Sequence, residues 1–115
     1  EQFCVARFGR RPLELLEEWG WLGGDVWLAH GVHFSAAEIS ELGRTGTGIA
    51  HCPSSNMRLG AGACSSAALI AAGARVGLGV DGAASNENYD LLAEVRQALL
   101  LARLRAAMLG DAEPA

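Results

Sequence analysis

The sequence has no apolar run approaching the roughly 20 residues needed to span a bilayer. Its first residues also lack the basic and apolar regions of a signal peptide. We therefore expect no contact with a membrane. Charged residues make up only 19% of the 115 residues, and the net charge of −4 argues against a nucleic-acid surface, which requires a basic patch. The chain does not begin with Met, which suggests a processed or truncated product.

Cysteine is scarce, and its spacing follows no metal-binding pattern. Cys4, Cys52 and Cys64 are odd in number and include no Cys-x-x-Cys pair, which argues against a structural zinc site. Free thiols are the ordinary state in a reducing compartment, so the cytoplasm is the expected location.

Hydrophobic residues, by contrast, make up 50% of the chain. A chain this apolar has a well-covered core or leaves faces for neighbouring segments to cover.

Three short apolar runs each end in a polar residue that suits metal-site chemistry. The runs cover residues 26–30, 47–51 and 75–81 and end in His30, His51 and Asp81. Each is followed by a loop and a helix-like stretch, an alternation that predicts a parallel sheet with right-handed crossovers. Because the carboxyl ends of parallel strands share one side, the two His and the Asp are expected to converge where barrel enzymes place their chemistry.

The predicted helices have recognisable starts. Pro12 begins a short helix over residues 13–19, and Ser35 with Glu38 forms a capping box that opens a helix over residues 36–42. Two more helices are predicted over residues 66–72 and 89–109, a long loop over 52–63, and a disordered tail over 111–115. The polar side of the last helix is expected to consist of Glu94, Arg96, Arg103 and Arg105. Three strands are too few for a closed α/β fold, so the sequence predicts part of a longer barrel.

Alternative interpretations remain open for each candidate residue. A His at a strand end is often structural, but Gly31 directly after His30 allows a backbone or ligand to approach closely. Asp81 can bind a divalent ion and accept a proton from water, or it can cap an Asx turn. His51 and Asn56 either line a pocket or belong to a turn that Pro and Ser residues favour.

Other patterns favour structural interpretations. Residues 77–82 match the spacing GxGxxG, but the glycines lie within a predicted strand and not at the start of a helix, so we reject a dinucleotide site. Cys52 has no partner His and Asn at a nucleophile's spacing, which favours a packed thiol, and His33 is expected in an exposed loop. Packing and domain or subunit contacts are expected of the tryptophans, Trp19, Trp21 and Trp27.

Three segments together resemble the amidohydrolase superfamily. They are WLAHGVH at 27–33, HCPSSNMRLG at 51–60 and GLGVDGAASN at 77–86, and the match is sharpened by FGRRPL at 8–13 and LAEVRQA at 92–98. The resemblance is to the branch of cytosine, guanine and triazine deaminases or chlorohydrolases. Within this branch the chain resembles 8-oxoguanine deaminases, often labelled hydroxydechloroatrazine ethylaminohydrolases. The resemblance covers nearly the whole chain.

This resemblance implies a fold and a set of metal ligands. The fold is an α/β, (β/α)₈ TIM barrel, of which residues 1–115 would supply about strands 6 to 8 with their flanking helices. The metal is divalent, usually zinc with iron as an alternative. It is held by a His-x-His of strand 1, a His of strand 5 and the Asp of strand 8, which is Asp81 here. The other ligands and a strand-5 His-x-x-Glu that shuttles protons are expected before Glu1.

The resemblance also implies roles for the remaining candidates. His30 would be the strand-6 histidine beside the activated water, so that His30 and Asp81 are the catalytic pair. His51 would belong to the strand-7 motif and, with Asn56 and Ser85, would shape or brace the substrate pocket.

The implied activity is hydrolytic deamination of a purine or related nitrogen heterocycle, with 8-oxoguanine as the first candidate. Metal-activated water would carry out the reaction in the full-length enzyme, a homo-oligomer that takes a small-molecule substrate. An s-triazine amino- or chlorohydrolase is an alternative. A hypothesis from another class is a truncated product without activity of its own, because the 115 residues contain only one of the metal ligands that the family requires.

Overall fold

The structure is a computed structural model that describes residues 1–110. Three parallel strands form one sheet in the order β1 (Trp27–Ala29), β2 (Gly48–His51) and β3 (Arg75–Leu78). The predicted α/β fold with a parallel sheet is therefore confirmed. The helices are α1 (Gln2–Phe8), α2 (Pro12–Glu18), α3 (Ala36–Thr45), α4 (Pro53–Arg58), α5 (Ser66–Ala71) and α6 (Leu91–Leu109). The disorder expected of residues 111–115 lies outside the described residues.

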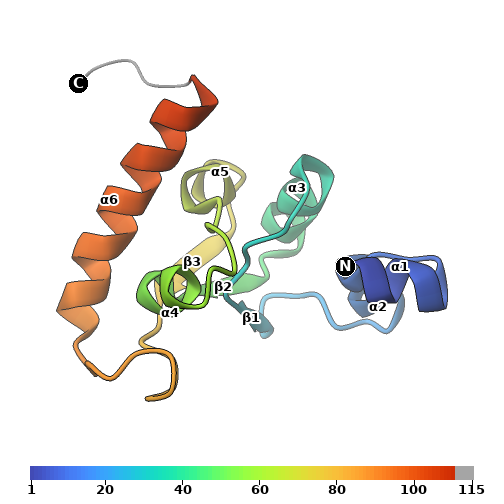
Figure 1. Ribbon diagram of the computed structural model, residues 1–115. Coiled ribbons are helices and arrows are strands. Elements are labelled where there is room, and N and C mark those ends of the chain that lie inside the picture. Colours follow the sequence, from blue (N-terminus) through green and yellow to red (C-terminus); the bar gives the residue numbers. More distant parts are fainter. Residues whose placement is uncertain (111–115) are drawn as a thin grey trace.

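Helices flank the sheet in chain order. Figure 1 shows α1 and α2 at one end of the molecule and α6 at the other, with the sheet between them. Helices α3 and α5 pack against each other, and α5 packs on β3. Helix α4 lies against α6, so the segment after β2 is held next to the last helix. Within residues 1–110, no helix combines the length and the apolar character needed to cross a membrane.

The strands pair in register across the sheet. Leu28 lies opposite Ile49, and Ile49 lies opposite Val76, so the three side chains form one row. This row faces the helices, because Ile49 is buried in the core and the other two pack against it. Side chains alternate between the two faces of a strand. The opposite face carries Trp27, which is 68% exposed, and opens on a hollow of about 430 Å³.

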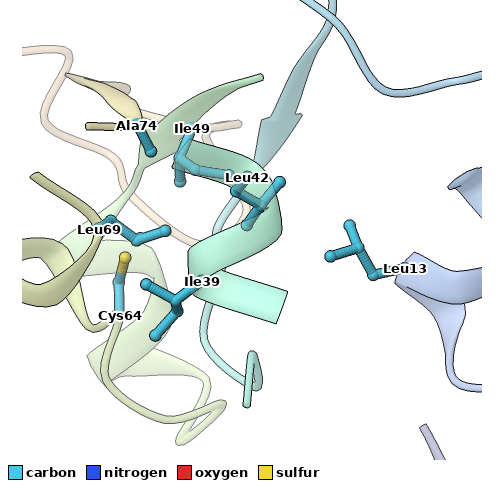
Figure 2. Close-up of a cluster of buried hydrophobic side chains, with 7 residues drawn as sticks. All are labelled: Leu13, Ile39, Leu42, Ile49, Cys64, Leu69 and Ala74. Carbon is cyan, nitrogen blue, oxygen red and sulfur yellow. The ribbon is translucent and has the colours of Figure 1, made fainter. Parts of the chain in front are cut away.

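The hydrophobic core lies between the sheet, α3 and α5. It consists of the buried residues Leu13, Ile39, Leu42, Ile49, Cys64, Leu69 and Ala74. In Figure 2 six of these side chains gather around α3 and β2, while Leu13 approaches Leu42 from α2. Each large aliphatic side chain buried in this way contributes about 1.5–3 kcal/mol. The core therefore fixes the sheet against two helices and anchors α2 to them.

The capping box predicted at the start of α3 is confirmed. Ser35 Oγ accepts from the backbone N–H of Glu38 at 3.2 Å, and Glu38 Oε2 accepts from the N–H of Ser35 at 2.7 Å. The same carboxylate receives two hydrogen bonds from the Arg11 guanidinium, both at 2.8 Å. Burial alone would raise the pKa of Glu38, but the bonds from Arg11 and Ser35 outweigh it and lower that pKa. This ion pair ties the start of α2 to the start of α3.

The last helix differs from the prediction at its start and on its buried side. It begins at Leu91 because Asp90 caps it, with Asp90 Oδ1 accepting from the N–H groups of Leu92 and Ala93 at 2.9 and 3.2 Å. Glu94 was expected on the polar side, yet it is only 1% exposed. Arg96 and Arg103 are exposed as predicted, but so are eight large apolar side chains of α6: Leu91, Leu92, Val95, Leu99, Leu100, Leu104, Met108 and Leu109.

One predicted loop was wrong, and one helix was not predicted. The segment 52–63 is not a continuous loop, because α4 begins at Pro53, a residue that suits the first turn of a helix. Helix α1 was not predicted, and it buries none of its residues. Each of the three tryptophans is more than 60% exposed, so packing within residues 1–110 does not bury them, and their contact with another domain or subunit stays a prediction.

Gly43 permits the close approach of α3 and α5. A Cβ at this position would lie 1.9 Å from the carbonyl oxygen of Ala72. Alanine favours a helix over glycine by roughly 1 kcal/mol, but overpacking costs about 1–3 kcal/mol. Because the neighbour is backbone and cannot rotate away, the overpacking cost should lie near the upper end of this range. After the helix gain is subtracted, we expect Gly43→Ala to lower the free energy of unfolding by about 2 kcal/mol.

Denaturant unfolding measures this change, and Ser40→Ala serves as the matched control. Ser40 is exposed on the same helix, so its replacement should alter the free energy of unfolding by less than about 0.5 kcal/mol. A Gly43→Ala protein as stable as the wild type would contradict the packing described for α3 and α5.

Candidate functional site

The carboxyl edge of the sheet brings two of the predicted residues face to face. His30 directly follows β1, and Asp81 lies three residues beyond the end of β3. The ring nitrogen Nε2 of His30 lies 3.7 Å from Oδ2 of Asp81. Both side chains are about one-third exposed, which leaves the gap between them accessible from solvent. The predicted convergence of these two residues is therefore present in the structure.

The backbone is strained at both residues. His30 has φ 70° and Asp81 has φ 64°, and they are the only non-glycine residues with positive φ within residues 1–110. This left-handed conformation costs about 1–3 kcal/mol when the surroundings impose it, and such strain concentrates at functional sites. Gly31 extends the left-handed turn with φ 62°, and a Cβ there would lie 2.9 Å from Cγ2 of Ile49. Tight packing thus accounts for the glycine after His30.

Asp81 is held by hydroxyl and backbone donors. Ser55 Oγ donates to Asp81 Oδ2 at 2.5 Å, and the N–H of Gly82 donates to Oδ1 at 2.8 Å. Ser85 Oγ lies 3.3 Å from the same Oδ2 and 2.8 Å from Ser55 Oγ. The bond from Ser55, followed by that from Gly82, lowers the pKa of Asp81, and the nearby His30 acts in the same direction. Asp81 is therefore an ionised carboxylate at neutral pH.

Asn56 fixes the orientation of the His30 ring. Asn56 Oδ1 lies 2.9 Å from Nδ1 of His30, and Asn56 is almost completely buried in α4. An amide oxygen only accepts, so Nδ1 carries the proton in this contact. In the neutral ring Nε2 is then an acceptor, and it faces the ionised carboxylate of Asp81. Two acceptors 3.7 Å apart suit a proton donor such as water, or a cation, bound beside them.

Asp81 is also suited to serve as a metal ligand. Carboxylate oxygens bind zinc and other divalent ions, and this one is ionised, partly exposed and held in place by donors on both oxygens. Among residues 1–110 there is no group of three or more His, Cys, Asp and Glu side chains that could hold a metal. The residues present fit one carboxylate ligand with a histidine beside it.

The structure places His51 differently from His30. Strand alternation puts His51 on the same face of β2 as Ile49, toward the helices, and the residue is only 1% exposed. Burial lowers the pKa of His51, and the negative charge of Glu94 offsets this only in part. Its Nδ1 has no hydrogen-bond partner within the described chain. His51 is thus a neutral, buried group behind the strand ends and is not hydrogen-bonded to His30 or Asp81.

Cys52 does not behave as a nucleophile. Burial raises the pKa of its thiol, and the charges of Asp81 and Glu94 raise it further. The thiolate is the reactive form, so this cysteine stays protonated and packs as an apolar side chain. Cys64 is similar, since burial raises its pKa to about 11.

Two polar residues at the site escaped the sequence analysis. Ser55 is completely buried and contacts Asp81, but it lay in a stretch interpreted as a turn. The available signal was Pro53, which opens a helix as readily as a turn. Glu94 is the second. The sequence analysis placed it on the polar side of the last helix, whereas its burial depends on a contact with Ser54, 40 residues away in the chain.

The Amidohydrolase family model matches residues 2–114, and the chain belongs to this family. The resemblance drawn from its motifs is thereby confirmed. The chain is 59% identical over 105 residues to the 8-oxoguanine deaminase of Pseudomonas aeruginosa (strain PAO1), and this match covers 91% of the chain and 23% of that protein. It is 52% identical over 102 residues to the hydroxydechloroatrazine ethylaminohydrolase of Pseudomonas sp. (strain ADP), covering 89% of this chain and 21% of the relative.

Solved structures of zinc-containing relatives share this fold. An adenosine deaminase from Xanthomonas campestris with bound zinc superposes with a TM-score of 0.89 at 35% identity, over 92% of this chain and 24% of that one. An atrazine chlorohydrolase from Arthrobacter aurescens TC1 complexed with zinc gives a TM-score of 0.84 at 36% identity, over 89% and 22%. The chain thus spans less than a quarter of the length of these relatives.

The two serines near Asp81 should affect its pKa unequally. Ser55→Ala removes the donor at 2.5 Å, so we expect the pKa of Asp81 to rise toward the usual range of an aspartate. Ser85→Ala is the matched control, because it removes the same hydroxyl at a distance of 3.3 Å and should raise that pKa less. Carboxyl-carbon NMR titration of the metal-free protein measures both shifts. A larger rise in the Ser85 variant would contradict this account of the carboxylate.

Proposed function

We propose that the protein containing this sequence is a metal-dependent hydrolase that deaminates a purine or related nitrogen heterocycle, with 8-oxoguanine as the first candidate. The observation that carries this proposal is the pair formed by Nε2 of His30 and the ionised Asp81, 3.7 Å apart at the carboxyl edge of a parallel sheet. Support comes from relatives named 8-oxoguanine deaminase and isoxanthopterin deaminase, which are 59% and 50% identical to the chain.

The proposal assigns residues 1–115 to about strands 6 to 8 of a (β/α)₈ barrel. The described sheet supports this assignment because its helices cover one face, while Trp27, Ala29 and Gly77 on the other face remain exposed. A barrel has the same arrangement, with helices outside and strand side chains directed inward. In this numbering β1, β2 and β3 are strands 6, 7 and 8.

The metal in this proposal is divalent, with zinc first and iron as an alternative. Zinc-bound relatives of the same fold support that choice. When bound, such an ion acts as a Lewis acid that makes water a nucleophile at neutral pH. Of this chain's residues, Asp81 would hold it through its carboxylate, and the remaining ligands would come from residues outside this sequence.

Within the chain, Asp81 and His30 have different roles toward the attacking water: Asp81 accepts its proton, and His30 orients it. Oδ2 of the ionised Asp81 accepts the proton that the attacking water loses, as a general base within reach of the gap. Nε2 of His30, kept free by the Asn56 contact at Nδ1, accepts a hydrogen bond from the same water and orients it. The water oxygen bonds to the ring carbon that bears the amine, and the carbon–nitrogen bond breaks. The family's strand-5 Glu, outside this sequence, would protonate the departing amine.

Three residues assigned to the pocket act mainly as braces in this proposal. Asn56 holds the His30 ring, and Ser85 holds Asp81 together with Ser55. His51 supports the strand end from the helix side, where it is buried. None of the three needs to touch the substrate for these roles.

An s-triazine amino- or chlorohydrolase is the second candidate function. The observation in its favour is the pair of triazine-related relatives, the ethylaminohydrolase at 52% identity and the atrazine chlorohydrolase with a TM-score of 0.84. The same water activation would serve both reactions, with an alkylamine or chloride as the leaving group. The 115 residues by themselves are proposed to be inactive, because Asp81 is the one metal ligand assigned within them.

The proposed enzyme acts on a small molecule and is expected to be a cytoplasmic homo-oligomer. All three cysteines are free, as in proteins of a reducing compartment. The exposed apolar side chains of α6 would be covered by other parts of the protein or by a second subunit.

Asp81→Ala in the protein that contains this sequence tests the proposal. We expect loss of zinc retention and a fall in kcat/KM of about 10³-fold or more, which corresponds to about 4 kcal/mol of lost transition-state stabilisation. Zinc content and ammonia release from 8-oxoguanine, guanine and a hydroxylated s-triazine measure these effects. Asp25→Ala is the control. Asp25 is an exposed carboxylate near the amino end of β1, whereas the site lies at the carboxyl end.

An Asp81→Ala protein that keeps both zinc and turnover would contradict the assignment. Chloride release from atrazine by the wild type without deamination of any purine would favour the second candidate.

A further inference from the structure

Glu94 is a buried carboxylate for which the proposed chemistry has no use. It lies in the first turn of α6 and is only 1% exposed, although α6 carries many exposed apolar side chains. Burying a carboxylate is costly unless hydrogen bonds replace its water. The contacts that replace this water therefore indicate what the residue is for.

Both oxygens of Glu94 accept hydrogen bonds from segments that carry the site. Oε2 accepts from the backbone N–H of Ser54 at 3.1 Å, and Oε1 accepts from Nδ2 of Asn86 at 2.9 Å. The same Nδ2 of Asn86 also donates to the carbonyl oxygen of Val80 at 2.9 Å. Glu94 thus joins the start of α4 to the loop that follows β3.

Each of these segments is adjacent in sequence to residues of the site. Ser54 directly precedes Ser55 and Asn56, whose side chains contact Asp81 and His30. Val80 directly precedes Asp81. Because one side chain bonds both segments, it sets the position of the donors in α4 relative to the carboxylate that they hold.

We propose that Glu94 is a positioning residue for the catalytic pair, acting through Ser54 on one side and through Asn86 on the other. This inference rests on the proposed function for the roles of Asp81 and His30. Its structural part, the joining of two segments by one buried carboxylate, stands without that function.

The geometry requires a carboxylate at this position, since two donors converge on two acceptor oxygens. Glutamine has nearly the same size but replaces one oxygen with an NH₂ group. The N–H of Ser54 cannot reverse, so the NH₂ group would face Asn86. Turning the Asn86 amide would then place its oxygen against the carbonyl of Val80. Glu94→Gln therefore breaks one link while preserving side-chain volume.

Three variants in the protein that contains this sequence test the proposal. Glu94→Gln weakens the link to Asn86, Asn86→Ala removes the link to Val80 while leaving the Ser54 contact, and Arg96→Gln is the control. Arg96 is exposed two residues from Glu94, and its replacement also changes the charge by one. The readouts are hydrogen–deuterium exchange of the metal-free protein, zinc affinity, and kcat and KM for deamination.

We expect Glu94→Gln and Asn86→Ala to speed amide exchange in residues 80–86. Substitution of groups that orient metal ligands typically costs 10–100-fold in metal affinity or activity. We therefore expect zinc affinity and kcat to fall by about 10–100-fold while KM changes less than about threefold. Arg96→Gln should leave exchange and kinetics unchanged.

Unchanged exchange in residues 80–86, or a fall in kcat that only parallels a loss of folded protein, would overturn the proposal. If Glu94→Gln fails to fold, Asn86→Ala decides alone by the same criteria. The exchange measurement needs no substrate and no metal. Faster exchange in a protein without deaminase activity would therefore overturn the proposed function while the positioning link remains.

Discussion

The in-register pairing of three parallel strands is the constraint on which the site depends. Because Leu28, Ile49 and Val76 form one row, the carboxyl ends of the strands lie along the same edge of the sheet. The chain leaves β1 at His30 and turns soon after β3 at Asp81. Both residues have the left-handed backbone conformation, with positive φ. The core between the sheet, α3 and α5 holds this edge in place. The strain at the two residues is thus balanced by packing elsewhere.

Helix α4 then supplies the side-chain hydrogen bonds that hold both residues at that edge. Its Ser55 donates to Asp81 and lowers the pKa of that carboxylate, while its Asn56 accepts from His30 and leaves Nε2 as an acceptor. In the proposed reaction, one short helix therefore supports both the base and the group that orients the water, which are complementary requirements for the activation of water. The family relationship and the zinc-bound relatives agree with such chemistry.

Much of the fold could be predicted from the sequence, and the failures have physical causes. The alternation of apolar runs with helical stretches predicted the parallel sheet, and Ser35 with Glu38 predicted the cap of α3, because both signals are local. Helix α4 was missed because Pro, Ser and Asn favour turns and helix starts alike. Glu94 was misplaced because its partner Ser54 is 40 residues away in the chain, so the contact depends on tertiary structure. The meeting of His30 and Asp81 was predictable from strand topology, whereas the hydroxyl and amide contacts that control them were not.

A crystal structure of the zinc-loaded protein that contains this sequence, with data collected at the zinc absorption edge, tests the central claim most directly. That claim is that His30 and Asp81 face one metal and one water. The account predicts an anomalous peak bound to a carboxylate oxygen of Asp81, with Nε2 of His30 beside it and Nδ1 still bonded to Asn56. Zinc bound elsewhere, with Asp81 held only by its serine and backbone donors, would contradict it.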